Sequence, residues 1–173
     1  MIKNVVDNSL RYGKQLDGDN IPLRQLFIII EIALKHGLKV GRRNLLQGKR
    51  DIWDLIQNIE KLDPGATDIT DTVRQLSTVT TQQGRLRAWL RLAVMQKRLA
   101  DYIKLVVDDK TLLDEYYEPE ALMRSEEAVL LCGLMVSLNI VDCNICLKEE
   151  DLDGHDHVLA GSTTTQADGQ STG

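Results

Sequence analysis

Apolar residues recur at helical spacing along most of this chain, and the spacing breaks only at loop-forming residues. Clusters of Gly, Pro and Asp separate the periodic stretches, as expected between short helices. After Asp153 the periodicity is lost, which predicts a flexible polar tail at 154–173. The pattern predicts helices at 2–12, 22–37, 50–63, 69–76, 83–108, 111–117 and 125–139.

The pattern also predicts the fold class. No set of strand-like stretches with alternating apolar and polar residues is found, and no βαβ order appears. A chain of 173 residues fits one domain that can build a core without disulfides or metals. We therefore expect an all-α protein in which 1–153 forms a single helical bundle.

The helix predicted at 22–37 is apolar almost all round. Its β-branched residues, Ile28 to Ile30, would by themselves favour a strand. The length of the segment, Pro22 at its start and Gly37 at its end favour a helix instead. A helix with this pattern lies at the centre of a core or is covered by a partner.

Arginines interrupt the apolar helix predicted at 83–108, which we expect to be the central column of the bundle. Counted from Arg85 at about 100° per residue, Arg87, Arg91 and Arg98 fall within about 40° of one another. This row would be the face of the helix that is open to water. Either the guanidinium groups solvate that face and pair with acids of neighbouring helices, or they bind carboxylates of a partner.

The charge of −5 is unevenly distributed, because the excess of acids lies from residue 148 onward. The preceding part is neutral, which argues against nucleic acid as a partner. A cationic cluster without any acid occupies 32–50. It could be a solvated loop without a partner, or it could attract an acidic protein, or anionic lipid at about 1 kcal/mol per residue near the surface. The cluster consists of Lys35, Lys39, Arg42, Arg43, Lys49 and Arg50.

The cysteines and histidines do not predict a metal site. Cys143 and Cys146 form a C-x-x-C, but His155 and His157 follow too closely and with the wrong spacing for structural zinc. With Cys132 the thiols are odd in number and follow no signal peptide, so we expect a reducing, cytoplasmic setting. The longest apolar run is shorter than the roughly 20 residues needed to span a bilayer.

No residue pattern predicts catalysis or a bound cofactor. His36 is the one histidine before the tail, and its expected role is to favour the end of a helix before Gly37. The G-x-x-x-x-G-K-[ST] loop of nucleotide hydrolases is absent, and the acids near Asp153 do not match a calcium-binding loop. We expect a chain without enzymatic activity, metal or cofactor.

Four segments resemble, in order and in spacing, the RUN domain of the RUFY (RUN and FYVE domain-containing) family. The glycine–arginine segment that opens the central helix is the most specific of them. Together they extend the resemblance from about Ile2 to Asp153. The segments are LRQLFIIIEIALKHGLK, GRLRAWLRLAVMQKRLADY, LLDEYYEPEALM and GLMVSLNIVDCNICLKEEDLD.

The resemblance implies a compact bundle of about eight helices and no enzymatic activity. It also implies an effector or adaptor that binds small GTPases of the Rab, Rap or Arf-like kinds on endosomal and lysosomal membranes. The isolated domain would be a monomer. The positions that the family would offer to a GTPase are Arg85, Arg87 and Arg91, and then Lys97, Arg98, His36, Lys39, Arg42 and Arg43.

The two ends depart from the family pattern. By the resemblance, the chain begins inside the first helix of the RUN domain at 1–153, and after Asp153 small polar residues replace the expected closing segment.

A second hypothesis for function needs no GTPase. In that hypothesis the basic segment at 35–50 holds the protein on anionic membrane lipid.

Overall fold

The computed structural model describes residues 2–12, 15–39, 51–148 and 150–154. These residues form helices and loops, with isolated bridges in place of strands, so the all-α prediction is confirmed for them. The α-helices are α1 (Ile2–Tyr12), α2 (Ile21–Lys35), α3 (Ile52–Leu62), α4 (Thr67–Arg74), α5 (Gln82–Met95), α6 (Leu99–Asp108), α7 (Lys110–Tyr116) and α8 (Glu126–Val136). The single-turn 3-10 helices are η1 (Pro64–Ala66), η2 (Leu122–Arg124) and η3 (Ser137–Ile140).

Local chemistry explains where these helices begin and end. The Asn20 side chain caps α2, and Asp51 and Asp54 form a reciprocal capping box at the start of α3. After α2, Gly37 has a φ of 68°, a conformation that residues with a Cβ rarely adopt. A Cβ at this position would also lie 2.7 Å from the Cα of Ala121. The glycine therefore allows the chain to turn close against the segment before η2.

The prediction of one helix at 83–108 is wrong, because the chain breaks between α5 and α6. Lys97 has a left-handed backbone with a φ of 60°. Its amide donates to the carbonyl of Val94, and the amide of Arg98 donates to that of Ala93, both over 2.9 Å. These two hydrogen bonds form a Schellman motif, which ends a helix. Arg98 consequently does not continue the row of arginines on α5.

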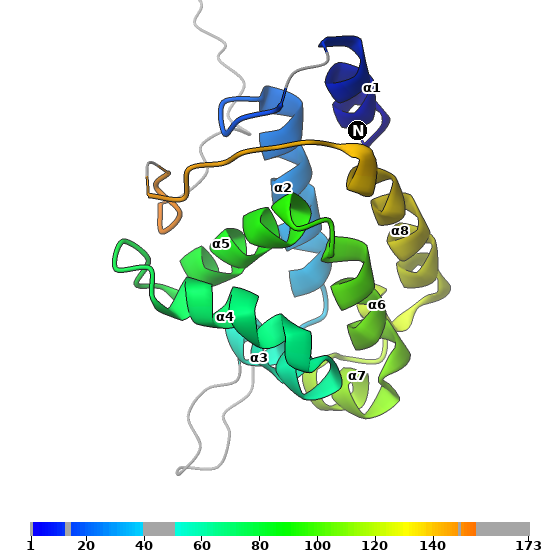
Figure 1. Cartoon of the computed structure of the whole chain (residues 1–173). Coiled ribbons are helices and arrows are strands. Elements are labelled where there is room, and N and C mark those ends of the chain that lie inside the picture. The colour runs from blue at the N-terminus through cyan, green and yellow to red at the C-terminus, as the bar shows by residue number, and fades with distance from the viewer. Residues whose placement is uncertain (1, 13–14, 40–50, 149, 155–173) are drawn as a thin grey trace, which may run out of the picture.

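α5 lies in the middle of the bundle, as predicted for the central column (Figure 1). It contacts α2, α3, α4 and α6. Leu86, Trp89 and Ala93 are completely buried on it. Trp89 packs on Tyr102 of α6 with 5.7 Å between the ring centroids. Burial of this kind is the main source of stability in a helical bundle.

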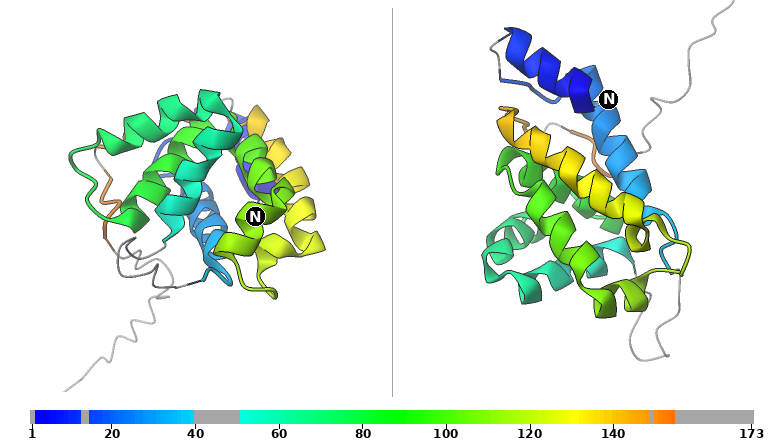
Figure 2. Two further views of the ribbon diagram at one scale, coloured as in Figure 1. Left: turned by 90° about the horizontal axis from the view of Figure 1, so that it is seen from below. Right: turned by 90° about the vertical axis from the view of Figure 1, so that its right-hand side faces the viewer.

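α8 closes another side of the bundle by packing along α6, and η3 then contacts α1. Figure 2 shows α8 running across the outside of α6, with α1 at one end of the molecule beside the start of α2. One face of α8 remains uncovered by the described residues, because Val129, Leu130 and Leu134 are all more than half exposed.

After η3 the chain returns across the bundle as an extended segment, which we call the strap (residues 141–148 and 150–154). Figure 1 shows it passing from the end of α8 over α2 toward the beginning of α5. Residues from 141 to 148 alternate between buried and exposed. The amide of Leu16 donates to Asp142 and that of Asn144 donates to Leu16, each over 2.8 Å. The strap is thus fixed as a short extended piece against an otherwise helical body.

Candidate functional site

The arginine row on α5 faces the protein interior at two of its positions. Arg87 and Arg91 are each 7% exposed. The Nε of Arg87 donates to Glu31 of α2 over 2.8 Å, and both side chains are less than 10% exposed. The prediction that this row is open to water is therefore wrong for Arg87 and Arg91. A buried guanidinium group is tolerated when a buried carboxylate neutralises it, as Glu31 does here.

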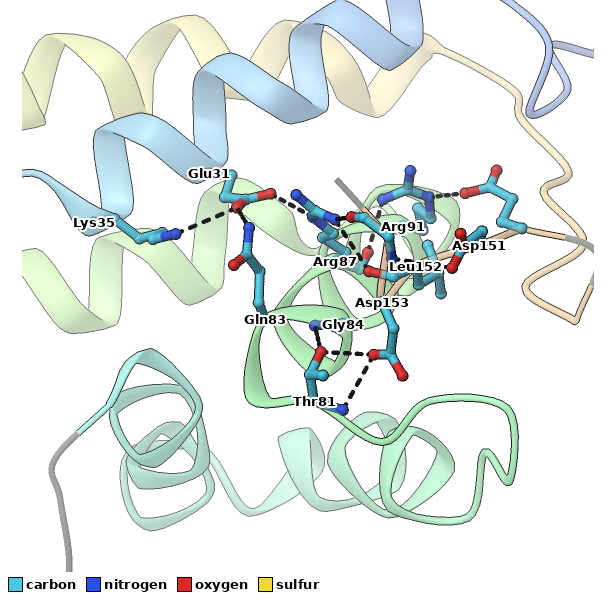
Figure 3. Close-up of polar contacts among 12 residues, drawn as sticks. Glu31, Lys35, Thr81, Gln83, Gly84, Arg87, Arg91, Asp151, Leu152 and Asp153 are labelled. Carbon is cyan, nitrogen blue, oxygen red and sulfur yellow. Dashed lines mark hydrogen bonds and ion pairs between the residues drawn. The ribbon is translucent and has the colours of Figure 1, made fainter. Parts of the chain in front are cut away.

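Glu31 is the centre of this polar network. Its Oε1 accepts a hydrogen bond from Gln83 over 2.6 Å and lies 3.6 Å from the Nζ of Lys35. Its Oε2 accepts from Arg87. Figure 3 shows Lys35, Gln83 and Arg87 converging on the carboxylate of Glu31. Both oxygens of the buried acid are thus satisfied, which removes the cost of an unpaired buried charge.

Arg91 joins α5 to the strap. Its Nε donates to the carboxylate of Glu150, and one of its terminal nitrogens donates to the Arg87 carbonyl over 3.1 Å. Its guanidinium carbon also lies 4.8 Å from the centroid of the Phe27 ring, a cation–π geometry. One side chain therefore contacts α2, its own helix and the strap.

Arg87 and Asp153 hold the end of the strap. A terminal nitrogen of Arg87 donates to the carbonyl of Leu152 over 3.1 Å and also to that of Gly154. The Asp153 carboxylate accepts from the side chains and backbone amides of Thr80 and Thr81. These hydrogen bonds lower the pKa of Asp153, so this attachment is complete at neutral pH and is lost in strong acid.

The strap also explains the glycine that opens the arginine segment. Gly84 lies in the first turn of α5, and a Cβ there would collide with the carboxylate of Asp153. Figure 3 shows Asp153 beside Thr81 and Gly84 at this point. We conclude that Gly84, Arg87 and Arg91 form one structural unit with the strap. Their arrangement fixes the strap and leaves little of Arg87 or Arg91 for a partner.

The remaining basic residues predicted on the central helix lie at the two ends of α5, with Arg85 at its start and Lys97 and Arg98 after its end. Arg98 donates to Asp63 over 2.8 Å and to Asp101 over 3.1 Å, with its guanidinium group 5.0 Å from the Tyr102 ring. Lys97 pairs with Asp142 of the strap over 2.7 Å. Arg85 is half-buried in the first turns of α5. Binding of a partner at these positions stays a prediction.

The basic residues at the end of α2 do lie together on the surface. Lys35 and His36 are exposed and Lys39 is half-buried. The Nδ1 of His36 accepts from the amide of Leu122, so the histidine has a structural contact beyond its expected place at a helix end. The Nζ of Lys39 donates to the carbonyl of Asp114 over 2.7 Å. We call Lys35, His36 and Lys39 the cationic end.

The rest of the cationic cluster, including Arg42 and Arg43, lies outside the described residues. Lipid binding through 35–50 therefore stays a prediction, and so does the flexible tail at 154–173, because residues from 155 onward also lie outside them. Within the described part of the chain, no helix is long and apolar enough to cross a membrane.

A cleft of about 460 Å³ adjoins the cationic end. The cleft wall includes Asp114, whose carbonyl accepts a hydrogen bond from Lys39. It also includes Met123, the residue after Leu122, whose amide donates to His36. The wall combines apolar and charged side chains, as protein-binding sites do. The lining consists of Val107, Lys110, Leu113, Asp114, Met123, Arg124, Ser125, Glu126 and Val129.

The thiols do not form a metal site in the described part of the chain, where no cluster of metal-ligating side chains occurs. Cys143 is buried and Cys146 exposed, because they occupy opposite faces of the extended strap. Burial raises the pKa of the Cys143 thiol to about 11, and nearby Asp142 adds to the effect. A thiol in this environment stays protonated, which makes it a poor metal ligand. His155 and His157 lie outside the described residues.

The family model for the RUN domain matches residues 25–149, and the chain belongs to this family. The resemblance found in the sequence is thereby confirmed.

Among individual proteins, the chain is 49% identical over 158 residues to human RUN and FYVE domain-containing protein 1, which covers 91% of this chain. It is 46% identical to human RUN and FYVE domain-containing protein 2, again over 91% of this chain. To human protein RUFY3 it is 44% identical over 99% of its length. The chain spans 22%, 26% and 38% of these relatives, respectively.

Proposed function

We propose that this chain is a non-enzymatic interaction domain that acts as an adaptor in membrane trafficking. In this proposal it is an effector of a small GTPase of the Rab, Rap or Arf-like kind, on endosomal or lysosomal membranes. Membership of the RUN family supports the adaptor role, and the resemblance to RUFY proteins supports the class of partner. The isolated domain acts as a monomer.

The observation that carries this proposal is the position of the cationic end beside the cleft. Lys39 is bound to Asp114 in the cleft wall, while half-buried Val107 and exposed Val129 supply apolar surface within the same cleft. An apolar centre with a charged rim is the usual composition of a protein interface. Positive groups on that rim speed the encounter with an acidic partner.

The GTPase surface in this proposal differs from the arginine row of α5. Arg87 and Arg91 are excluded because each is 7% exposed and each is bound to an internal carboxylate. The cationic end, with Arg42 and Arg43 next to it in the sequence, takes their place. A small GTPase would present a complementary surface only in its GTP-bound state. This chain would therefore bind the GTP-bound form more tightly than the GDP-bound form, as an effector must.

Charge reversal tests this surface. Replacing Lys39, Arg42 and Arg43 together by Glu should reduce capture of a GTP-loaded Rab, Rap or Arf-like protein at least about tenfold, because attraction becomes repulsion. The measurement is binding across a panel of these GTPases, each loaded with a GTP analogue or with GDP. The melting temperature of the variant is measured as well, because Lys39→Glu also removes the hydrogen bond to the Asp114 carbonyl.

The matched control reverses Lys3, Arg11 and Arg24, three exposed cations on α1 and α2. This variant has the same net charge and should retain GTP-dependent capture. Equal loss in both variants would show that binding follows net charge alone. Undiminished capture by the Lys39, Arg42 and Arg43 variant would remove the cationic end from the interface.

A further inference from the structure

α8 leaves several large apolar residues exposed, although it buries Met135 at 1% exposure. On its inner side, Ala128 and Cys132 are less than 10% exposed. On its outer side Leu130 is 68% exposed and Leu134 is 58% exposed. Soluble domains rarely leave so many large apolar side chains together on one helix unless a partner covers them. We call the outer residues Val129, Leu130, Gly133, Leu134 and Val136 the α8 face.

The face is nearly continuous along the helix. Val129 and Val136 are 62% and 55% exposed, and Ile140 in η3 extends the apolar surface with 54% exposure. Viewed down the helix at about 100° per residue, the exposed positions cover roughly half of its circumference. Past the first turn, every exposed position of α8 is apolar or glycine.

Gly133 makes a shallow notch in the middle of the face. Among the described residues, no atom apart from its chain neighbours and its own helix backbone lies within 4 Å of the position that a Cβ would occupy. Glycine lowers the stability of a helix interior by about 1 kcal/mol relative to alanine. A close crossing by another helix uses such a notch, since the absence of a side chain allows the two backbones to approach. Leu130 and Leu134 stand on either side of the notch.

The charge at one end of the face specifies the partner further. Glu126 and Glu127 are exposed in the first turn of α8, and no cation of the described residues pairs with either of them. Arg124, the nearest basic residue in the sequence, is already bound to Asp114 over 2.6 Å. From Asp114 to Glu127 the chain carries six carboxylates and one arginine. A partner with basic residues at this end would gain two exposed carboxylates as ion-pair contacts, although that of Glu127 already accepts a hydrogen bond from Ser125.

We propose that the α8 face binds an amphipathic helix from another protein. The apolar residues of the partner helix recur at intervals of three and four, as in other helices that bind in apolar grooves. The partner helix carries Lys or Arg in its last turn, where these residues lie opposite Glu126 and Glu127 of α8. The two helices are antiparallel, because lysines suit the C-terminal end of a helix dipole and glutamates suit the N-terminal end. The interaction domain thereby has a second surface, which shares Glu126 and Val129 with the cleft but includes no residue of the cationic end.

Other occupants fit the face less well. A second copy packed in parallel would bring its own Glu126 and Glu127 to these carboxylates. A second copy packed antiparallel would bring the C-terminal end of its α8, where residues 132–141 contain no Lys or Arg. An anionic membrane would be repelled by the same glutamates, which lie at the edge of the apolar surface. An amphipathic helix with a basic end satisfies both the apolar residues and the charges.

The test uses a synthetic helical peptide of about five turns as the probe. It carries Leu at positions repeating by three and four, with two lysines in its last turn. A second peptide has glutamates in place of these lysines, and a third has the same composition in shuffled order. Binding to the complete chain is measured by fluorescence anisotropy. We expect the lysine peptide to bind at least about tenfold more tightly than either of the others.

Variants of the chain identify the site. Leu130→Ser with Leu134→Ser should weaken binding of the lysine peptide at least about tenfold without lowering the melting temperature, since both side chains are more than half exposed. The matched control is Ile29→Ser with Ile32→Ser on α2, also exposed at 44% and 56%, which should leave binding unchanged. Glu126→Lys with Glu127→Lys should reverse the preference, so that the glutamate peptide binds more tightly.

Three results would overturn the proposal. Equal affinity for the ordered and the shuffled peptide would show that the face has no helix specificity. Concentration-dependent dimerisation that disappears in the Leu130 and Leu134 variant would make a second copy the occupant. Binding of phosphatidylserine vesicles through the same two leucines would make the face a membrane contact instead.

Discussion

The arginines of α5 have a sequence pattern that is compatible with two opposite roles. An apolar helix with a row of guanidinium groups predicts either a docking surface or internal ion pairs. Sequence spacing located the row but could not locate the acids, because Glu31 lies 56 residues before Arg87 and Glu150 lies 59 residues after Arg91. Only the folded chain shows that both acids lie next to the row.

The internal ion pair between Arg87 and Glu31 predicts a large loss of stability when either residue is replaced. Arg87→Gln and Glu31→Gln should each lower the free energy of unfolding by up to about 3 to 5 kcal/mol, because each removes the main opposite charge of a buried group. The double variant should lose less than the sum of the two, as coupled residues do. Urea unfolding of the single and double variants measures these changes.

The control for this cycle is an exposed pair. Asp71→Asn removes the ion pair between Asp71 and Arg74, whose atoms are 2.7 Å apart and whose side chains are 52% and 35% exposed. It should change the free energy of unfolding by no more than about 1 kcal/mol. If Arg87→Gln costs no more than this control, the internal ion pair is not important for the fold.

At the scale of helices, the sequence predicted most elements and missed one boundary. The bounds of α1, α2 and α3 follow apolar spacing and capping residues that are visible in the chain. The break after α5 has the backbone of a Schellman motif but carries Lys97 where a glycine is usual. Because position 97 is not a glycine, the sequence does not indicate the end of the helix. The helical spacing of apolar residues continues through the break and therefore predicts one long helix.

This strained position gives a prediction for α5. Lys97→Gly should have a free energy of unfolding about 1 kcal/mol higher than Lys97→Ala, because glycine adopts a positive φ at no steric cost. Both variants lose the ion pair with Asp142, so the comparison isolates the backbone. Thermal or denaturant unfolding of the two variants measures the difference. A stability of Lys97→Ala equal to that of Lys97→Gly would contradict a left-handed backbone at this position.

At the scale of the whole molecule, the fold class and the family could be predicted and the strap could not. Four segments in the right order were sufficient to identify a RUN domain; three of them lie mainly on helices α2 and α5 to α7, and the fourth runs from the end of α8 into the strap. The alternation of buried and exposed residues at 141–148 was present in the sequence but is too short to stand out among helices. Its place in the fold depends on Arg87, Arg91 and Gly84, which belong to α5.

The same scale explains why the predicted binding residues do not form one surface. Arg87 and Arg91 are inside, Lys97 and Arg98 lie at the break after α5, and the cationic end lies at the end of α2. The α8 face was not predicted, because the sequence of α8 is apolar all round and gives no sign of which side is covered. Tertiary packing on α6 decides that side.

The central claim is that Arg87 and Arg91 hold the strap inside the domain, and amide hydrogen exchange of residues 150–154 tests it most directly. Arg87→Lys keeps the charge but loses the forked contacts to the carbonyls of Leu152 and Gly154. We predict at least about tenfold faster exchange in the strap of this variant, with the core of α6 unchanged. Exchange in the strap as slow as in the unchanged chain would contradict the claim.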